Sequence, residues 1–226
     1  HTIDELPIEM IDLRHYDAQD QDHHFYQQVD PLAKKPFDYE NELPIKVKLF
    51  RLSDSGYRIF FIISHIAFDG WSVGVFNKEL AEAYNHFLVG KIPPLSELTY
   101  QYQDYAKAQR ERESSGHYVK SLDYWKKQLE FPLQQLDLAD LTPKTASTAH
   151  GNTVEFHFDR ELSDGIQKLA KSHRSSMYGI MLSLFKAAIY GMKGFEDIIV
   201  GSPFANRHYP GVDNLLGFFV NMLPVR

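Results

Sequence analysis

Cysteine is absent from the 226-residue sequence, which excludes disulfides, a cysteine nucleophile and thiolate metal sites. No stretch approaches the roughly 18 apolar residues that a membrane-spanning helix requires. The N-terminus also lacks the basic-then-apolar pattern of a secretory signal. These absences suit a reducing compartment, and we expect a cytoplasmic protein.

The chain also lacks a large excess of charge of one sign, because the net charge is only −6 and acidic and basic residues are mixed along the chain. This balance argues against a nucleic acid or an anionic membrane as the main partner. Hydrophobic residues make up 43% of the chain and aromatic residues 14%, which allows a sizeable core in one large or two small domains. The sequence lacks an initial Met and begins abruptly, so we expect a piece of a longer protein.

Two neighbouring histidines, His23 and His24, lie beside Asp20 and Asp22 in a predicted helix. Adjacent side chains on a helix point in different directions, so these histidines are poorly placed to bind one ion. We interpret the stretch as a solvated helix face and predict no metal site.

The most informative part of the chain joins a strand pattern to a helix pattern. Residues 57–63 form a near-continuous apolar run, which predicts a buried strand, and residues 72–89 carry apolar side chains at helical spacing. His65 leaves the strand in a tight turn, where a fold can present a rigid imidazole that exchanges a proton near neutral pH. Asp69 can brace this turn by pairing with a cation or with backbone N–H groups. Gly70 lets the backbone turn sharply or a substrate approach closely.

Periodicity predicts the other elements. The predicted strands are residues 8–13, 45–52, 151–159 and 197–201, and the predicted helices are residues 17–35, 99–113, 117–130, 161–173 and 177–192. The turn at residues 53–56 predicts a hairpin that delivers the chain to His65. Ser72 is the expected N-cap of the helix over residues 72–89, and Gly90 is its expected end. The helix over residues 177–192 is apolar on most sides, so we expect it to be central to its half.

A loss of periodicity over residues 131–150, with Thr, Ser, Ala and Pro in its place, is typical of a surface connection. We therefore predict an N-terminal subdomain over residues 1–135 that contains the loop 64–72. A linker over residues 136–150 and a second subdomain over residues 151–226 follow. The order of strands and helices predicts an α/β fold with two mixed layers.

Four motifs occur in one order along the chain. They are His65-Ile66-Ala67-Phe68-Asp69-Gly70-Trp71-Ser72, Tyr102-Gln103-Asp104-Tyr105-Ala106, Gly201-Ser202-Pro203-Phe204-Ala205-Asn206-Arg207, and Gly217-Phe218-Phe219-Val220-Asn221 with Arg226. In this order they resemble the motifs of the condensation domains of nonribosomal peptide synthetases, which belong to the chloramphenicol-acetyltransferase-like superfamily. The chain is identified as a member of this family on the four motifs together, because each alone is a weak signal.

The resemblance implies a chloramphenicol-acetyltransferase-like fold of two similar subdomains. Its implied activity is amide formation in secondary-metabolite and antibiotic biosynthesis. The amine of an acceptor attacks the thioester of a donor, and phosphopantetheine arms of donor and acceptor carrier-protein domains hold both substrates. A neighbouring adenylation domain is the other implied partner, and no directly bound cofactor is implied.

The resemblance also implies roles for individual residues. His65, Asp69 and Gly70 form the catalytic group: His65 moves a proton, Asp69 holds the loop, and the backbone N–H of Gly70 meets the developing oxyanion. The implied substrate-binding residues are Ser64, Trp71, Ser72, Arg207 and Asn221, of which Arg207 and Asn221 are expected near the cleft between the two halves.

The sequence departs from the family pattern in two respects. The family usually has two successive histidines (HHxxxDG), and here Ser64 takes the first position. The second histidine, here His65, carries function in the family, so we expect activity to persist. The family domain is also much longer, and its upstream arginine-rich motif, a source of a cation for Asp69, has no counterpart here. We therefore expect a central fragment in which both subdomains are truncated.

Other functions remain open beside condensation. An epimerisation domain of the same family shares the histidine motif, and a degenerate module that only docks carrier proteins is suggested by Ser64 and the short chain. A plain acetyltransferase of the superfamily has its histidine motif near the chain's end, whereas here a long segment with the other motifs follows Ser72.

Overall fold

The computed structural model of the protein describes residues 6–131, 133 and 153–226. It contains two compact units, one of His1–His117 with Pro203–Met222 and one of Tyr118–Ser202 with Leu223–Arg226. Helices and strands are mixed along the chain, which confirms the predicted fold class. The linker predicted over residues 136–150 lies outside the described residues, so the predicted subdomain boundaries stay a prediction; the compact units follow a different division. No helix among the described residues is long and apolar enough to cross a membrane.

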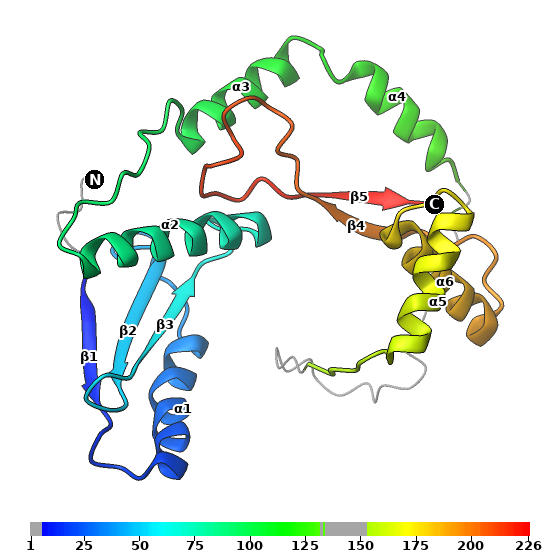
Figure 1. The fold of residues 1–226 in the computed structure, drawn as a ribbon. Helices are drawn as coiled ribbons and strands as arrows, with labels where there is room; N and C mark the ends of the chain where they lie inside the picture. The colour runs from blue at the N-terminus through cyan, green and yellow to red at the C-terminus, as the bar shows by residue number, and fades with distance from the viewer. Residues whose placement is uncertain (1–5, 132, 134–152) are drawn as a thin grey trace. The chain divides into compact units, whose positions relative to one another are not determined.

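The first unit is built on a three-stranded sheet in the order β1-β2-β3 (Figure 1). The strands are β1 (Ile8–Asp12), β2 (Ile45–Arg51) and β3 (Tyr57–Ile63). β1 runs parallel to β2, and β2 pairs with β3 as the predicted antiparallel hairpin. The register pairs Ile45 with Ile63, so the chain leaves the sheet directly after β3 and enters the predicted loop.

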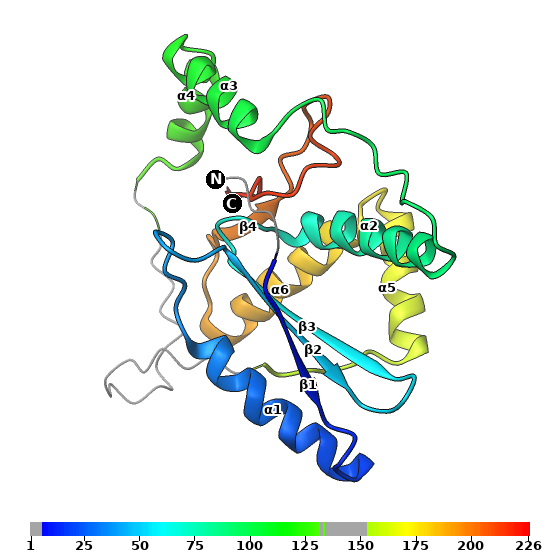
Figure 2. The same ribbon diagram turned by 90° about the vertical axis from the view of Figure 1, so that its left-hand side faces the viewer.

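Helix α1 (Ala18–Lys34) contributes to one of the hydrophobic clusters of this unit and lies along the sheet (Figure 2). Its buried Phe25 and Val29 pack with Phe50 of β2 and Leu13 after β1. Phe50 is fully buried. Burying such aromatic and aliphatic side chains supplies the main stabilisation of the unit.

β3 is less buried than predicted. Phe60 packs on the α1 side, and Phe61 contacts Phe76 of helix α2 on the other side. Tyr57 and Ile59, which share a face with Phe61, remain 52% and 44% exposed. A continuous apolar run indicates a strand with two apolar faces, but burial of each face depends on what packs there.

Three helices follow the loop: α2 (Gly70–Leu88), α3 (Tyr102–Ser114) and α4 (Val119–Gln128). The predicted N-cap of α2 was wrong by three residues, because Asp69 and not Ser72 caps the helix. The Asp69 side chain accepts the backbone N–H of Ser72, which satisfies one of the free donors of the first turn. Gly90 follows α2 with a φ of 68°, a conformation that glycine adopts readily, as the sequence predicted.

The second unit contains helices α5 (Arg160–Ser172) and α6 (Met177–Lys193), which pack through Ile166, Ala170 and Ile180. The expectation that α6 is central to its half was wrong for the described residues, because Phe185, Tyr190 and other apolar side chains of α6 are exposed. The two strands β4 (Val200–Phe204) and β5 (Asn221–Val225) pair with each other, and the division between the units runs through both.

Two predicted strands need correction. Residues 153–159, the described part of the stretch 151–159, form no strand, although Val154, Phe156 and Phe158 alternate. Alternation predicts an extended chain, but a strand also needs a neighbouring strand, and neither sheet among the described residues includes this segment. The strand predicted over residues 197–201 begins three residues later, at Val200.

Candidate active site

The loop that joins β3 to α2 holds its first residue inside and its second outside. Ser64 is buried, and its backbone N–H donates to the carbonyl of Pro44 over 2.8 Å. Its carbonyl accepts the N–H of Ala67 over 3.0 Å, which closes a tight turn. The Ser64 hydroxyl lies 2.8 Å from the Tyr39 hydroxyl. The following residue, His65, is exposed, so a fixed backbone presents the imidazole to solvent.

Asp69 ends the loop and is buried, with only 2% of its surface exposed. Its Oδ1 accepts the backbone N–H of Ser72 over 2.8 Å and a guanidinium N–H of Arg207 over 2.9 Å. Its Oδ2 accepts the backbone N–H of Phe219 over 3.0 Å. The carboxylate therefore joins the loop, the first turn of α2 and a segment 150 residues further along the chain.

Arg207 supplies the cation for this carboxylate. Its Nη1 donates to the carbonyls of Val212 and Leu215 over 2.9 and 2.7 Å, and its guanidinium lies 4.1 Å from the ring centre of Phe219. The side chains of Arg207 and Asp69 are only 2% and 1% exposed. The cation for Asp69 was expected from an upstream motif that has no counterpart here; this was wrong, because the partner lies 138 residues downstream in the same chain.

The pKa of Asp69 is lowered although the group is buried. Burial by itself raises the pKa of a carboxyl group, since it disfavours the charged form. Here the hydrogen bonds from the N–H groups of Ser72 and Phe219, from the Ser72 hydroxyl and from Arg207 outweigh burial. Asp69 is therefore ionised near neutral pH and serves as a fixed acceptor.

Ser72 fastens the segment at residues 217–219 to the start of α2. It is fully buried, and its Oγ accepts the N–H of Gly217 over 3.1 Å. The same hydroxyl lies 2.8 Å from Asp69 Oδ1 and 3.0 Å from the Gly217 carbonyl, and its single proton can serve one of them at a time. A serine hydroxyl is small enough to fit at this crossing and still both donate and accept.

The exposed imidazole of His65 meets an aromatic ring from that segment. The ring centres of His65 and Phe218 are 5.2 Å apart and the planes are at 87°, an edge-to-face contact. A cavity of about 410 Å³ lies beside the loop, and its lining includes Ile66, Ala67, Tyr102 and Leu216. The cavity is largely apolar, which suits an uncharged part of a substrate.

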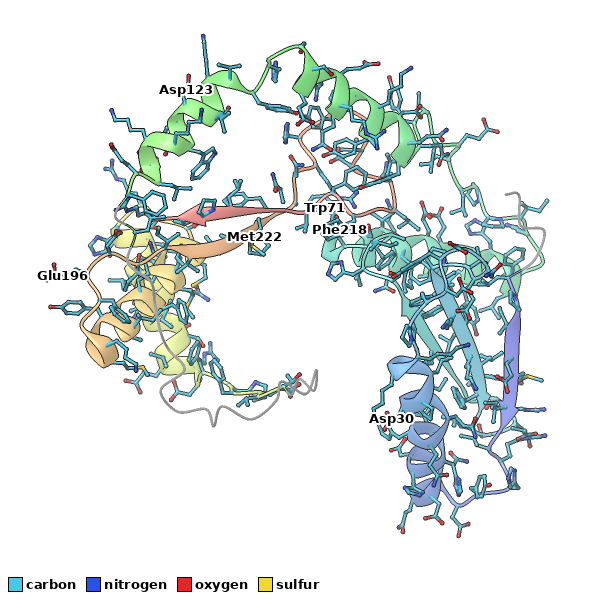
Figure 3. The ribbon with its side chains drawn as sticks, turned by 180° about the vertical axis from the view of Figure 1, so that it is seen from behind. Asp30, Trp71, Asp123, Glu196, Phe218 and Met222 are labelled. Atoms are coloured by element: carbon cyan, nitrogen blue, oxygen red, sulfur yellow. The ribbon has the colours of Figure 1, made fainter. Side chains whose placement is uncertain are left out.

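A larger groove of about 900 Å³ runs along the first turns of α2, and its lining includes Gly70, Trp71 and Gly74. The Trp71 indole donates to the carbonyl of Asp213 over 3.0 Å. Figure 3 shows Trp71 at the start of α2 and Phe218 on the segment that meets this helix. A Cβ added to Gly70 would meet no atom within 4 Å, and its φ is not in the left-handed region. Gly70 therefore adopts no conformation that is special to glycine, and close approach by a substrate stays a prediction.

The predicted site residues fall into two sets. Ser64, Asp69, Ser72 and Arg207 are buried, and all but Ser64 belong to one connected network. The other set is exposed: His65, Gly70, Trp71 and Asn221. Asn221 begins β5, and no described contact joins its side chain to the loop. The buried residues can affect a substrate only through the loop that they hold.

Sequence reasoning missed three residues around the loop. Tyr39 contacts Ser64, Phe218 contacts His65, and the Tyr102 hydroxyl donates to the Phe218 carbonyl over 2.8 Å. Tyr102 and Phe218 both lie within the recognised motifs, so the motifs marked these two residues but did not indicate what they contact. Tyr39 lies in a polar stretch of irregular structure, and no local pattern singles it out.

The sequence and the structure were compared with those of known proteins. The family model described as "Condensation domain" matches residues 1–226, the whole chain. The chain belongs to the condensation-domain family. This confirms the resemblance that the four motifs indicated.

Individual relatives agree with the family. Malpinin synthetase of Mortierella alpina is 32% identical over 222 residues, which is 98% of this chain and 3% of that protein. The crystal structure of VibH, a condensation enzyme of a nonribosomal peptide synthetase, is 22% identical with a TM-score of 0.74, over 96% of this chain and 50% of that one. The epimerization domain from the third module of tyrocidine synthetase B is 17% identical with a TM-score of 0.81, over 96% of this chain and 50% of that one.

These structural likenesses confirm the predicted chloramphenicol-acetyltransferase-like fold. This condensation-domain chain spans about half the length of each of those two structures. At these levels of identity the structures show the fold alone, because one fold can carry several reactions.

Proposed function

We propose that this condensation domain forms an amide bond between two substrates that carrier proteins deliver as thioesters. A donor and an acceptor carrier-protein domain present them on phosphopantetheine arms, an adenylation domain lies in the same synthetase, and the protein works in the cytoplasm. The exposed His65 on a loop fixed by the buried Asp69–Arg207 pair is the observation that carries this proposal.

The reaction requires an amine, a thioester and the movement of one proton. The neutral amine of the acceptor attacks the thioester carbonyl carbon, so a C–N bond forms and the carbonyl oxygen takes up the negative charge. As the carbonyl reforms, the C–S bond breaks and the sulfur leaves with the electron pair. The nitrogen loses one proton and the sulfur gains one, which yields an amide and a free thiol. His65 can carry that proton, because an imidazole both accepts and donates near neutral pH.

The start of α2 is suited to meet the developing oxyanion. The first amides of a helix have no partner inside the helix, and the N-terminal end carries partial positive charge. Gly70 is the first residue of α2, and no described residue accepts its N–H. Its missing side chain leaves open space beside this donor. We assign the oxyanion contact to the Gly70 N–H on this basis.

The remaining predicted residues divide by exposure. Asp69, Ser72 and Arg207 act by holding the loop, since the Asp69 carboxylate, the Ser72 hydroxyl and Nη2 of Arg207 are already engaged with one another. Trp71 and Asn221 are exposed and can contact a substrate directly. Ser64 is buried against Tyr39, so its contribution is to the shape of the turn.

Epimerisation and a purely docking role are the competing functions. The fold does not separate them from condensation, because the epimerization domain of tyrocidine synthetase B has a TM-score of 0.81 to this chain. The chemistry does separate them: condensation joins two carried substrates, epimerisation inverts one carried residue, and docking changes neither.

The test uses the full-length protein with an aminoacyl-loaded donor carrier and an aminoacyl-loaded acceptor carrier. Mass spectrometry of the acceptor carrier measures amide formation, and chiral analysis of the hydrolysed donor residue measures epimerisation. We expect an amide product that His65→Ala abolishes. Inversion of the donor without an amide would replace condensation by epimerisation, and carrier binding with no chemical change would establish docking.

A further inference from the structure

The imidazole of His65 has no hydrogen-bond partner among the described residues. A histidine that transfers a proton has to point its ring nitrogens in a defined direction, and a second polar group often sets that direction. Here the ring contact is with Phe218, in edge-to-face geometry. The rotamer of an exposed imidazole is otherwise limited only by its own torsions.

Phe218 is itself held firmly although its side chain is partly exposed. The backbone of the segment is fastened at three successive residues: the Gly217 N–H donates to Ser72 Oγ, the Phe218 carbonyl accepts the Tyr102 hydroxyl, and the Phe219 N–H donates to Asp69. Burial alternates over these residues, so Phe219 points inward and Phe218 points outward. The outward ring is therefore placed by a fixed backbone.

Tyr102, the first residue of α3, fits closely against this segment. A Cβ added to Gly217 would lie 2.4 Å from Cδ2 of the Tyr102 ring, so only glycine lets the ring approach. The ring of Tyr102 also contacts that of Phe219, with centres 5.1 Å apart. Burial, and then the charge of Asp69, raises the pKa of the Tyr102 hydroxyl, which keeps it protonated as a donor.

We propose that Phe218 and Tyr102 are positioning residues for His65: the Phe218 ring sets the direction of the imidazole, and the Tyr102 hydroxyl fixes the Phe218 backbone. The proposal deepens the proposed function and rests on it for its effect on rate. The orientation of His65 is a physical property that can be measured without any reaction.

The test is made on the full-length protein with ¹³C-labelled histidine, whose ring resonances NMR resolves; His65→Ala identifies the His65 signal. The variants are Phe218→Leu, which removes the aromatic ring, and Tyr102→Phe, which removes only the hydroxyl. Phe218→Tyr keeps the ring and serves as rescue. Tyr100→Phe is the matched control, because no described residue hydrogen-bonds the Tyr100 hydroxyl.

In Tyr102→Phe, which keeps the Phe218 ring, we expect the His65 ring signals to move because the imidazole changes its direction relative to that ring. In Phe218→Leu they should move further, because the same change adds to the loss of the Phe218 ring current. Phe218→Tyr and Tyr100→Phe should keep the wild-type positions. In single-turnover amide formation, Phe218→Leu should be slower by about two- to tenfold, the range that an aromatic pair supplies, and Tyr102→Phe should be slowed less. Thermal unfolding of each variant shows that the fold is retained.

His65 signals that stay at their wild-type positions in Phe218→Leu would overturn the proposal, and signals that do not respond to Tyr102→Phe would remove Tyr102 from it. The failure of the proposed function and the failure of the positioning proposal give different results. If the wild-type protein forms no amide but the His65 signals depend on Phe218, the proposed function fails and the positioning stands. If amide formation depends on His65 but the His65 signals and the rate ignore Phe218, the function stands and the positioning fails.

Discussion

Two aspartate–arginine pairs, one from each compact unit, differ in their surroundings more than in their geometry. Asp69 and Arg207 are 2.9 Å apart in the first unit, and Asp197 and Arg226 are 2.6 Å apart in the second. The side chains of the first pair are at most 2% exposed, whereas those of the second are 31% and 34% exposed. Contact distance alone would rank the second pair as the stronger.

The difference in burial reverses that ranking when one partner is removed. A charge that loses its partner in water regains hydration, but a buried charge does not. Asp69 and Arg207 also hold backbone groups from three segments, whereas Arg226 pairs with Asp197 and with the carbonyl of Gln128. The buried pair therefore fixes a loop, and the exposed pair only fastens a chain segment.

The largest effect is expected from Arg207→Met. It leaves Asp69 buried without its cation and removes the donors to the carbonyls of Val212 and Leu215. Breaking a buried pair in this way costs about 3–5 kcal/mol of unfolding free energy. Urea unfolding of wild type and variant measures it. A loss of less than about 1 kcal/mol would show that this pair behaves like a surface pair.

The second effect is on the pH dependence of stability. The pKa of Asp69 is lowered in the folded protein, so its ionised form stabilises the fold at pH values above the unfolded pKa, about 4. This contribution is lost as the pH falls through the folded pKa. We expect the stability difference between wild type and Asp69→Asn to be full at pH 7 and to shrink in acid. Denaturant unfolding from pH 7 down to pH 3 checks this, and a difference that grows in acid would contradict it.

Ser64→Ala separates burial from charge, because Ser64 is buried in the same loop but its contact with Tyr39 is between neutral hydroxyls. Loss of one such hydrogen bond costs about 0.5–1.5 kcal/mol, so amide formation should stay within about tenfold of wild type. The assay is run beside His65→Ala. A Ser64→Ala loss as large as that of His65→Ala would give Ser64 a direct role in the reaction.

The smallest effect is expected from Arg226→Met, the same substitution as Arg207→Met but at the exposed pair. Water and dissolved ions can replace Arg226 around Asp197, so the stability loss should be at most about a quarter of that in Arg207→Met. It should also become smaller when salt is added, because salt screens exposed charges. The same urea titration measures both arginine variants. Equal losses of unfolding free energy would show that burial does not distinguish the two pairs.

Local pattern predicted most of the fold near the site. The hairpin of β2 and β3, the helix that follows the loop, and helix α1 follow from periodicities of two and of about 3.6 residues, which are set by nearby residues. The stretch at Val154 to Phe158 alternates equally well and forms no strand. Pairing is a relation between distant segments, so alternation could not decide it.

The sequence by itself determined the family, through four motifs, and the position of His65 at the end of a strand. Only the tertiary structure decided what surrounds that histidine. Arg207 is the cation for Asp69, Ser72 lies inside the network, and Phe218 meets the imidazole. The reason is physical: backbone periodicity depends on adjacent residues, whereas a buried charge finds its partner wherever the folded chain brings one.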